Sequence, residues 1–213
     1  MRVLLTGFDP FEGNAINPAL EVVKGVRERI GEIEIKKLEI PTVFGKSIQR
    51  ILEVAEEFKP DVILSIGQAG GRFEMSLERV AINLNDARIK DNDGNQPIDE
   101  VIFPDGENAY FSNLPIKAMI QEMKEANIPA SISNTAGTFV CNYVMYAVLY
   151  HIAKNKIAKK GGFIHIPYMP EQVINKPNTP CMEKERMIKG VEIAIECIAK
   201  YTQDIELSGG REH

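Results

Sequence analysis

The sequence contains no tryptophan, only three cysteines and only three histidines. No apolar run approaches the roughly 20 residues that a membrane-spanning helix requires, so we expect no membrane span. The cysteines are odd in number and none lies in a C-x-x-C motif, which leaves a disulfide framework and a structural zinc site without support. The amino terminus also lacks the pattern of a secretory signal, so a reducing cytoplasm is the expected compartment.

The chain is also short of positive charge. It has 25 Lys and Arg against 30 Asp and Glu, a formal net charge of -5. Proteins that bind nucleic acid through its phosphates carry an excess of positive charge, so nucleic acid is not an expected partner. With 213 residues, 44% of them hydrophobic, the chain is long and apolar enough for one globular domain with a sizeable core.

Strand-like apolar segments alternate with amphipathic helix-like segments, with no linker or repeat between them. This alternation predicts a single α/β domain over about 1–207 with a mixed, mostly parallel central sheet, followed by a frayed tail at 208–213. Residues 85–113 interrupt the alternation and are rich in turn formers, which predicts a hairpin or excursion there. The predicted strands are about 2–6, 33–40, 61–66, 76–84, 129–133 and 162–166, and the predicted helices are about 17–29, 46–58, 115–126, 140–154 and 182–200.

Three short motifs look like cofactor or ion sites, but none has the required spacing. Gly45–Ser47 has the ending of a phosphate-binding loop, yet Ile40, followed by proline, stands where that loop needs glycine. Gly67–Arg72 departs from the G-x-G-x-x-G dinucleotide motif, and Asp91–Gly94 lacks the glutamate that completes a calcium loop. No cofactor or metal is therefore expected. Gln68, at the carboxyl end of a predicted strand, is still a candidate ligand contact.

Cys141 is expected near the start of the predicted helix 140–154. Backbone amides and the positive dipole end of a helix stabilise a thiolate, the reactive form of cysteine, and can donate to an oxyanion. A purely packed cysteine is the alternative, since free cysteines are commonly buried. Cys197 lies inside the last predicted helix and is expected to be structural. Cys181, just before that helix, is either a helix cap or a redox or oligomer contact.

Among the three histidines, His165 is the best candidate for a general base. It lies near the carboxyl end of the predicted strand 162–166, where α/β sheets bind ligands, and imidazole is the usual general base. A packed core histidine is the alternative. His151 follows Cys141 by ten residues on one predicted helix, about 15 Å along its axis, and His213 falls in the predicted frayed tail.

Glu78 lies in the predicted strand 76–84 and shares a face with Val80, Ile82 and Leu84, because side chains alternate across a strand. A carboxylate on an apolar face needs a partner, so Glu78 is a candidate for orienting the imidazole of a cysteine hydrolase. A salt bridge with an arginine, or exposure at the strand end, is an equally good interpretation.

With Glu78, Cys141 and His165 in these positions, the sequence resembles the pyroglutamyl peptidase I family, also called pyrrolidone carboxyl peptidases. The likeness runs along almost the whole chain in several ordered motifs. These motifs are Thr6-Gly7-Phe8-Asp9-Pro10-Phe11, Gly67-Gln68-Ala69-Gly70-Gly71-Arg72, Leu77-Glu78-Arg79-Val80-Ala81-Ile82-Asn83, Asp86-Ala87-Arg88-Ile89-Lys90-Asp91-Asn92, Ser133-Asn134-Thr135-Ala136-Gly137-Thr138-Phe139-Val140-Cys141-Asn142 and Phe163-Ile164-His165-Ile166-Pro167-Tyr168.

The resemblance implies a three-layer α/β/α sandwich, a homotetramer, and a cysteine peptidase that removes N-terminal pyroglutamate from peptides through a thioester, without a metal or cofactor. It implies Cys141 as the nucleophile, His165 as base and acid, and Glu78 as the residue that orients His165. The substrate-binding and oxyanion residues that it implies are Phe8 and Phe11 against the lactam ring, Val140 beside the ring, Gln68 at the ring amide, and Arg88 near the oxyanion with the backbone N–H of Cys141.

The sequence departs from the family pattern at Glu12, where the opening loop usually has glycine. A side chain at this position excludes any conformation that only glycine adopts. A different class of function is a small-molecule binding protein on a nucleoside-phosphorylase-like α/β scaffold, in which Cys141 is only packed. An unreactive thiol and a phosphate-dependent activity would favour that alternative.

Overall fold

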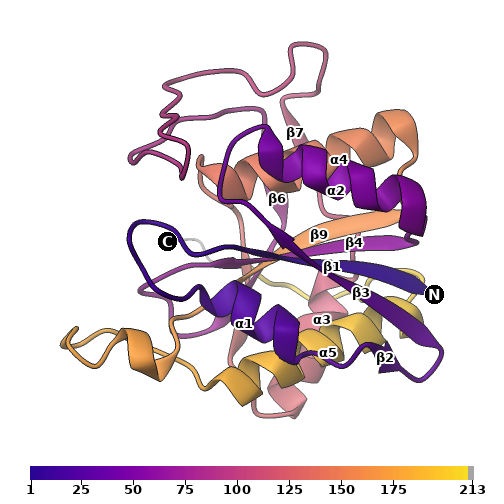
Figure 1. The fold of residues 1–213 in the computed structure, drawn as a ribbon. Helices are drawn as coiled ribbons and strands as arrows, with labels where there is room; N and C mark the ends of the chain where they lie inside the picture. The colour runs from indigo at the N-terminus through magenta and orange to yellow at the C-terminus, as the bar shows by residue number, and fades with distance from the viewer. Residues whose placement is uncertain (211–213) are drawn as a thin grey trace.

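The structure is a computed structural model that describes residues 1–210. The strands of its main sheet are β1 (Arg2–Phe8), β2 (Arg29–Ile30), β3 (Ile33–Ile40), β4 (Val62–Gln68), β5 (Met75–Glu78), β8 (Ala130–Ser133) and β9 (Lys160–Ile166). Within the described residues this sheet has seven strands in the order β2-β3-β1-β4-β9-β5-β8 (Figure 1). β2 is antiparallel to β3, and β5 is antiparallel to β9, whereas the other neighbours are parallel. The predicted mixed, mostly parallel sheet is confirmed.

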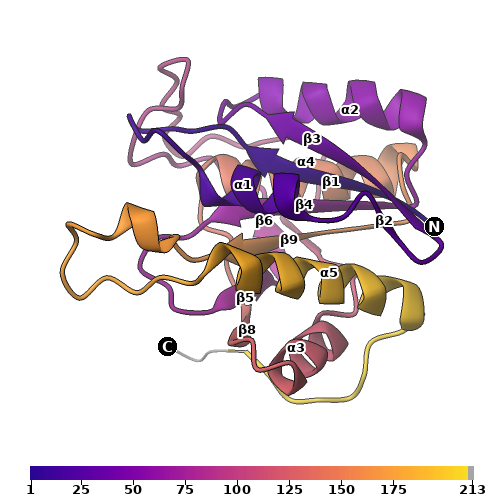
Figure 2. The same ribbon diagram turned by 60° about the horizontal axis from the view of Figure 1, so that its bottom comes forward.

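Helices cover both faces of this sheet. On one face lie α1 (Pro18–Gly25), α3 (Ile116–Glu125) and α5 (Lys184–Lys200), and on the other lie α2 (Lys46–Phe58) and α4 (Val140–Asn155) (Figures 1 and 2). Each face has its own apolar core, because alternate side chains of the central strands point to opposite sides. The three-layer α/β/α sandwich is therefore confirmed.

The segment between β6 (Val80–Ile82) and β7 (Ala109–Phe111) leaves the main sheet, as predicted for 85–113. β6 and β7 form a two-stranded antiparallel sheet of their own. Asn142 of α4 is fully buried, and its side-chain amide makes hydrogen bonds of 2.9–3.0 Å with the backbone at the end of β6. Since buried amides left unpaired cost free energy, these bonds hold the excursion against α4.

The prediction of one strand over 76–84 is wrong. β5 ends at Glu78 and pairs in the main sheet, whereas β6 begins at Val80 and pairs with β7 in a separate sheet. Ile82 is only partly buried while Glu78 is fully buried, so the two residues do not share one apolar face. Alternation of side chains cannot reveal this break, because the residues on each side of Arg79 continue the same pattern.

The predicted helix 17–29 is too long. α1 ends at Gly25, and residues 29–30 form β2 at the edge of the sheet instead. Gly25 lies so close to α5 that a Cβ there would be 2.3 Å from Cδ1 of Ile188. Tertiary packing therefore sets this boundary, and the apolar periodicity of the segment does not.

The end of the described chain is tied to the residue between β5 and β6. The carbonyl oxygen of Gly209 accepts a hydrogen bond from the guanidinium of Arg79. Residues 211–213, and with them His213, lie outside the described residues. Across residues 1–210, every helix is too short or too polar to cross a bilayer.

Candidate active site

The carboxyl ends of β1, β4 and β9 lie side by side, and the candidate site forms there (Figure 1). β9 lies between β4 and β5 in the sheet, so the connection 69–74 from β4 to β5 passes over the end of β9. This crossing brings the segment after Gln68 next to His165, which lies at the end of β9. Crevices outside the carboxyl ends of strands are the usual ligand sites of such sheets.

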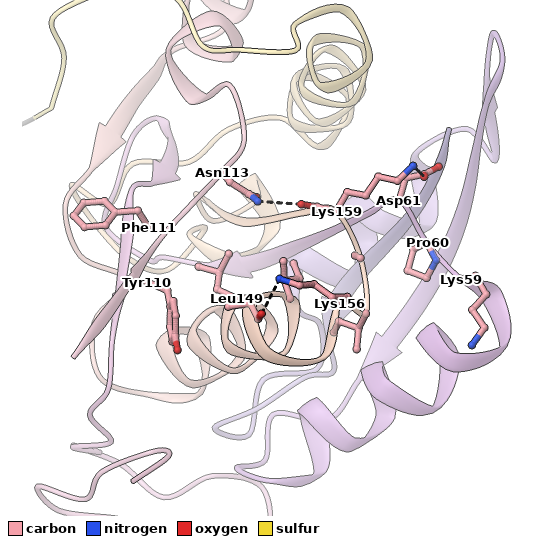
Figure 3. Close-up of a pocket in the computed structure, with 13 residues that line it drawn as sticks. Lys59, Pro60, Asp61, Tyr110, Phe111, Asn113, Leu149, Lys156 and Lys159 are labelled. Carbon is pink, nitrogen blue, oxygen red and sulfur yellow. Dashed lines mark hydrogen bonds and ion pairs between the residues drawn. The ribbon is translucent and has the colours of Figure 1, made fainter. Parts of the chain in front are cut away.

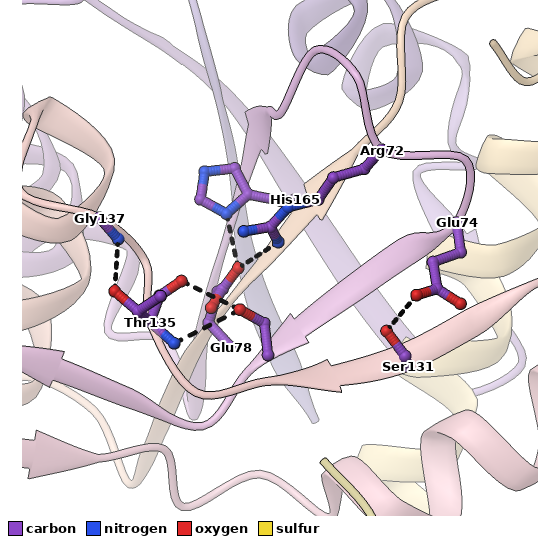
Figure 4. A network of polar contacts seen from close by, with 8 residues as sticks. Arg72, Glu74, Glu78, Ser131, Thr135, Gly137 and His165 are labelled. Atoms are coloured by element: carbon purple, nitrogen blue, oxygen red, sulfur yellow. Dashed lines mark hydrogen bonds and ion pairs between the residues drawn. The ribbon is translucent and has the colours of Figure 1, made fainter. Parts of the chain in front are cut away.

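The register of β5 against β9 brings Glu78 to His165. Ser76 is directly opposite His165, and Glu78, two residues further on, points to the same face. Oε1 of Glu78 lies 2.7 Å from Nδ1 of His165, and the same oxygen accepts a 3.0 Å hydrogen bond from Nη1 of Arg72 (Figure 4). The Glu78 side chain is fully buried. The sequence left the role of this glutamate open, and the structure gives it two partners, an imidazole and an arginine.

His165 is buried, with 5% of its surface exposed, and is hydrogen-bonded to Cys141. Because Nδ1 faces Glu78, Nε2 is the nitrogen left to face the thiol. Burial alone would lower the pKa of His165, but the charges and hydrogen bonds of Cys141 and Glu78 outweigh it and raise the pKa to about 9. Near neutral pH the imidazole therefore holds a second proton and is positively charged.

Cys141 is the second residue of α4, as the sequence predicted, and is partly exposed. The preceding loop is shaped by short polar turns, in which Gly137 N donates to Oγ1 of Thr135 and Ser133 Oγ donates to the carbonyl of Thr135. The first N–H groups of a helix have no carbonyl partner within the helix. The amide of Cys141 is therefore a donor beside its own sulfur, which is the arrangement that an oxyanion needs.

A cavity of about 570 Å³ opens in front of Cys141 and His165. It brings together most of the residues that the sequence singled out. Val140 is fully buried in the core and does not line this cavity, and Glu78 lies behind His165. The lining residues are Phe8, Phe11, Glu12, Asn17, Thr42, Gln68, Gly70, Asp86, Arg88, Ile89, Ala136, Gly137, Thr138, Phe139, Cys141, His165 and Tyr168.

Aromatic rings form one part of the cavity wall. The Phe8 ring packs 6.2 Å from the ring of Phe163, and the Phe11 ring lies 6.5 Å from that of Phe139. Phe139 in turn meets Phe44 edge-on at 5.5 Å. Phe139, which precedes α4, was not among the predicted contacts, although it stands next to the predicted Val140 in the sequence. Flat apolar walls of this kind suit a flat, uncharged ring.

The polar candidates lie at different depths. Arg88 is exposed at the rim of the cavity. The carbonyl of its neighbour Ala87 accepts a 3.1 Å hydrogen bond from Nε2 of Gln96. Gln68 is partly buried, and its Oε1 accepts a 3.0 Å hydrogen bond from Gln172. That bond leaves Nε2 of Gln68 as the group that can donate to a bound ligand.

Three separate segments are joined behind the opening loop. Oδ1 of Asp9 accepts hydrogen bonds from the backbone N–H of Thr42 at 2.7 Å and from the side chain of Asn92 at 3.2 Å. Asn92 also donates to the carbonyl of Pro10. Asp91 is buried, which would raise its pKa, but hydrogen bonds from Asn95 and neighbouring amides lower it. The segment 91–95, a plain turn by its sequence, thus anchors the wall that carries Phe11.

Glu12 adopts a left-handed conformation, with φ of 56°, and Gly13 follows at 73°. A residue with a side chain reaches this region at a cost of about 1 kcal/mol relative to glycine. The opening loop therefore keeps the glycine-type conformation in spite of the glutamate, whose side chain lines the cavity.

The other cysteines and the second histidine lie elsewhere. His151 is hydrogen-bonded to Asn155 at 2.9 Å, one turn further along α4. Cys197 is buried in α5, and burial raises the pKa of its thiol to about 12. Cys181 is exposed, and its backbone bridges to that of Tyr168. All three described cysteines are free thiols.

A second cavity of about 620 Å³ lies at the opposite ends of β4 and β9 (Figure 3). Its wall combines Tyr110, Phe111 and Leu149 with lysines at the rim. Lys159 is paired with Asp61 at 2.7 Å, so this rim charge is already compensated. Neither cavity has three metal-binding side chains within reach of one ion, and the same holds throughout residues 1–210.

The sequence profile of the pyroglutamyl peptidase family matches residues 1–201. The chain belongs to this family. A pyrrolidone-carboxylate peptidase from Clostridium perfringens is 60% identical over 210 residues, which are 99% of both chains. The enzyme of that name from Fusobacterium nucleatum is 61% identical over 209 residues, or 98% of both chains.

Solved structures of family members have the same fold. Pyroglutamyl peptidase I from Bacillus amyloliquefaciens superposes with a TM-score of 0.92 at 46% identity, covering 96% of this chain and 99% of that one. A mutant pyrrolidone carboxyl peptidase from Pyrococcus furiosus gives a TM-score of 0.90 at 44% identity, covering 94% and 99%. The family fold therefore extends over nearly the whole of this chain.

Gly67 provides a test of how tightly the thiol is held. It is directly opposite His165 in the sheet, and a Cβ there would lie 2.7 Å from Cζ of Phe163 and 3.0 Å from Sγ of Cys141. We expect Gly67→Ala to displace the thiol and to lower the reactivity of Cys141 towards iodoacetamide about tenfold. Alkylation rates followed by mass spectrometry measure this.

Gly161→Ala is the matched control. A Cβ at Gly161 would meet Cδ1 of Ile152 at 2.6 Å in the same core, but far from the thiol. Both variants should lose about 1–3 kcal/mol of unfolding free energy. Equal alkylation rates in the two variants would show that Gly67 does not set the position of the sulfur.

Proposed function

We propose that the chain is a cysteine peptidase that hydrolyses the amide bond after an N-terminal pyroglutamyl residue. The observation that carries the proposal is the hydrogen-bonded series Cys141, His165 and Glu78 at the end of an aromatic-walled cavity. Membership of the pyroglutamyl peptidase family supports the substrate class. Residues 1–207 would act as one catalytic domain.

In the proposed reaction the Cys141 thiolate attacks the carbonyl carbon of the pyroglutamyl residue. The carbonyl π electrons move to oxygen, and the resulting oxyanion accepts hydrogen bonds from the Cys141 N–H and from Arg88. The His165 imidazolium then gives its Nε2 proton to the leaving nitrogen as the C–N bond breaks. The amine departs, and a pyroglutamyl thioester of Cys141 remains.

Hydrolysis of this thioester uses the same groups in reverse roles. His165, now neutral, takes a proton from a water molecule as the water oxygen attacks the thioester carbonyl. Collapse of the second oxyanion breaks the C–S bond and releases pyroglutamate. The Cys141 thiolate and the His165 imidazolium are restored. Glu78 stays ionised throughout, holding Nδ1–H of the ring and stabilising its positive charge.

The cavity chemistry suits a five-membered lactam. The ring carries no charge, and the rings of Phe8, Phe11 and Phe139 offer it apolar surfaces. Nε2 of Gln68 can donate to the lactam carbonyl, which a proline ring lacks. A substrate with an unblocked α-amino group would have to lose the hydration of a positively charged ammonium group against the aromatic wall, at a cost in desolvation.

The alternative of a non-peptidase binding protein on a nucleoside-phosphorylase-like scaffold is not favoured. Family membership and the pairing of Cys141 with a buried His165 both argue for a reactive thiol. A purely packed cysteine would have no need of an imidazole held in place by a carboxylate.

Release of a fluorophore from pyroglutamyl-aminomethylcoumarin tests the proposal. We expect the wild-type chain to cleave this amide and to leave alanyl and prolyl amides uncut. Cys141→Ala should lower kcat at least about a thousandfold, because no nucleophile remains, while its unfolding transition stays close to the wild type. Full activity in Cys141→Ala would contradict the cysteine mechanism, and cleavage of prolyl amides at the same rate would contradict the substrate class.

The pH dependence tests the role of His165. The imidazolium must protonate the leaving amine, and its pKa is raised to about 9, so the proton is present below that pH and is lost above it. We therefore expect kcat/KM to fall about tenfold per pH unit above about pH 9. Glu78→Gln keeps the shape of the side chain but removes its charge, which lowers the pKa of His165. The fall of kcat/KM with rising pH should therefore begin at a lower pH in this variant. If kcat/KM of the wild type already fell at the ordinary pKa of histidine, this ion pair would be ruled out.

We also propose that the peptidase works in the cytoplasm, as its cysteine content indicated, and that it forms a homotetramer, as the family resemblance implied. Free cysteines and a thiol nucleophile suit a reducing compartment. Large apolar side chains exposed at Ile98, Val101, Phe111 and Ile174 are of the kind that subunit interfaces cover. Light scattering should give about four times the 23.8 kDa chain mass, with or without reductant. A monomer at micromolar concentration would contradict the assembly.

A further inference from the structure

Two donors converge on a single oxygen of Glu78. Nδ1 of His165 lies 2.7 Å from Oε1, and Nη1 of Arg72 lies 3.0 Å from the same atom (Figure 4). The carboxylate is fully buried, and its other oxygen has no hydrogen-bond partner among the described residues. Within residues 1–210, His165 and Arg72 therefore supply all of the hydrogen bonding that keeps this buried anion in place.

Arg72 reaches Glu78 because of the chain topology. It belongs to the connection that crosses over the end of β9, and its backbone N–H closes a turn onto the carbonyl of Ala69. Its side chain is 32% exposed, so it approaches the buried carboxylate from the solvent side. Arg72 does not line the cavity that holds Cys141. Its direct contact with the reactive groups is therefore the hydrogen bond to Glu78.

The charges of the reactive groups do not balance without Arg72. A Cys141 thiolate, a His165 imidazolium and a Glu78 carboxylate together carry a net charge of about -1 in a site where charge is poorly solvated. The guanidinium of Arg72 brings this sum to zero. An arginine keeps its positive charge at every pH at which the enzyme could work.

We propose that Arg72 is a positioning residue that holds the Glu78 carboxylate towards His165 and neutralises the excess negative charge of the reactive cluster. This inference rests on the proposed function, because it assigns Arg72 a part in the same reaction. Arg72 stabilises the Glu78 anion and, as a cation, opposes the second proton on His165. The imidazole can then lose and regain that proton during the reaction.

Other charged groups near His165 do not replace Arg72. Cys141 approaches from α4 and Glu78 from β5, and both are negative when ionised. The cavity side brings Glu12, Asp86, Arg88 and Tyr168. Glu12, Asp86 and Arg88 are exposed, so water screens them. Arg72 is the cation that is hydrogen-bonded to the cluster itself.

The test compares Arg72→Gln, Arg72→Lys and Arg79→Gln with the wild type. Arg72→Gln removes the charge and keeps a donor, so the pKa of His165 and the descending limb of kcat/KM should both move up by about one pH unit. Arg72→Lys keeps the charge, so the pH at which kcat/KM falls should stay within about 0.3 pH units of the wild-type value. KM should change less than about twofold in both, because Arg72 does not line the cavity.

Arg79→Gln is the matched control, because it removes the same charge from the residue after Glu78. Arg79 binds Asn134 and Gly209 instead of the reactive groups. We expect the pH profile of Arg79→Gln to equal that of the wild type. The same upward shift in Arg79→Gln would show that net charge alone is responsible and would overturn the proposal.

Titration of His165 by NMR gives a second readout that does not need activity. The chain has only three histidines, so the signal of His165 can be assigned with His165→Gln. An unchanged His165 pKa in folded Arg72→Gln would show that Arg72 is only a structural salt bridge. If Arg72→Gln does not fold, Arg72→Met makes the same test. If the wild type cleaves no pyroglutamyl amide, the proposed function fails, whereas cleavage with unshifted Arg72 variants refutes this inference alone.

Discussion

The hydrogen bond between Glu78 and His165 is the interaction on which the rest of the site depends. It is possible because β5 runs antiparallel to β9 inside a sheet that is otherwise mostly parallel. The antiparallel register puts Glu78 diagonally across from His165 on the face that α4 covers. The same face brings Cys141, at the start of α4, onto the free side of the ring. One change of strand direction therefore determines which residues can form the reactive group.

The sequence predicted the parts of the site that depend on local pattern. The helix that begins at Val140 follows from a turn-rich loop and an apolar segment, and His165 follows from a short apolar strand. The position of Glu78 could not be derived in this way, because the break at Arg79 and the pairing of β5 with β9 join residues far apart in the chain. Arg72 lies in the motif Gly67–Arg72, but its role cannot be derived from that motif, because its partner depends on where the loop between β4 and β5 crosses β9.

The cavity wall that carries Phe8 and Phe11 also depends both on local sequence and on contacts between distant segments. Phe8 and Phe11 are close in sequence, but their loop is held by Thr42 and Asn92, which come from two other segments. Asp91 folds the second of these segments around its own carboxylate. A turn-rich stretch that carries no reactive group thus fixes the shape of the pocket. The sequence alone does not predict this contribution, because it depends on hydrogen bonds between three segments that are far apart in the chain.

The raised pKa of His165 has a further consequence for the proposed reaction. Near neutral pH the imidazole already holds the proton that the leaving amine needs, so the first step requires no prior proton transfer. Once that proton has left with the amine, Cys141 is a neutral thioester that no longer raises the pKa of the ring, so Glu78 is the remaining group that supports the neutral imidazole as a base for activating water. The base therefore forms only after the thioester exists. An imidazole of ordinary pKa, mostly neutral from the start, would lack the acid for the first step.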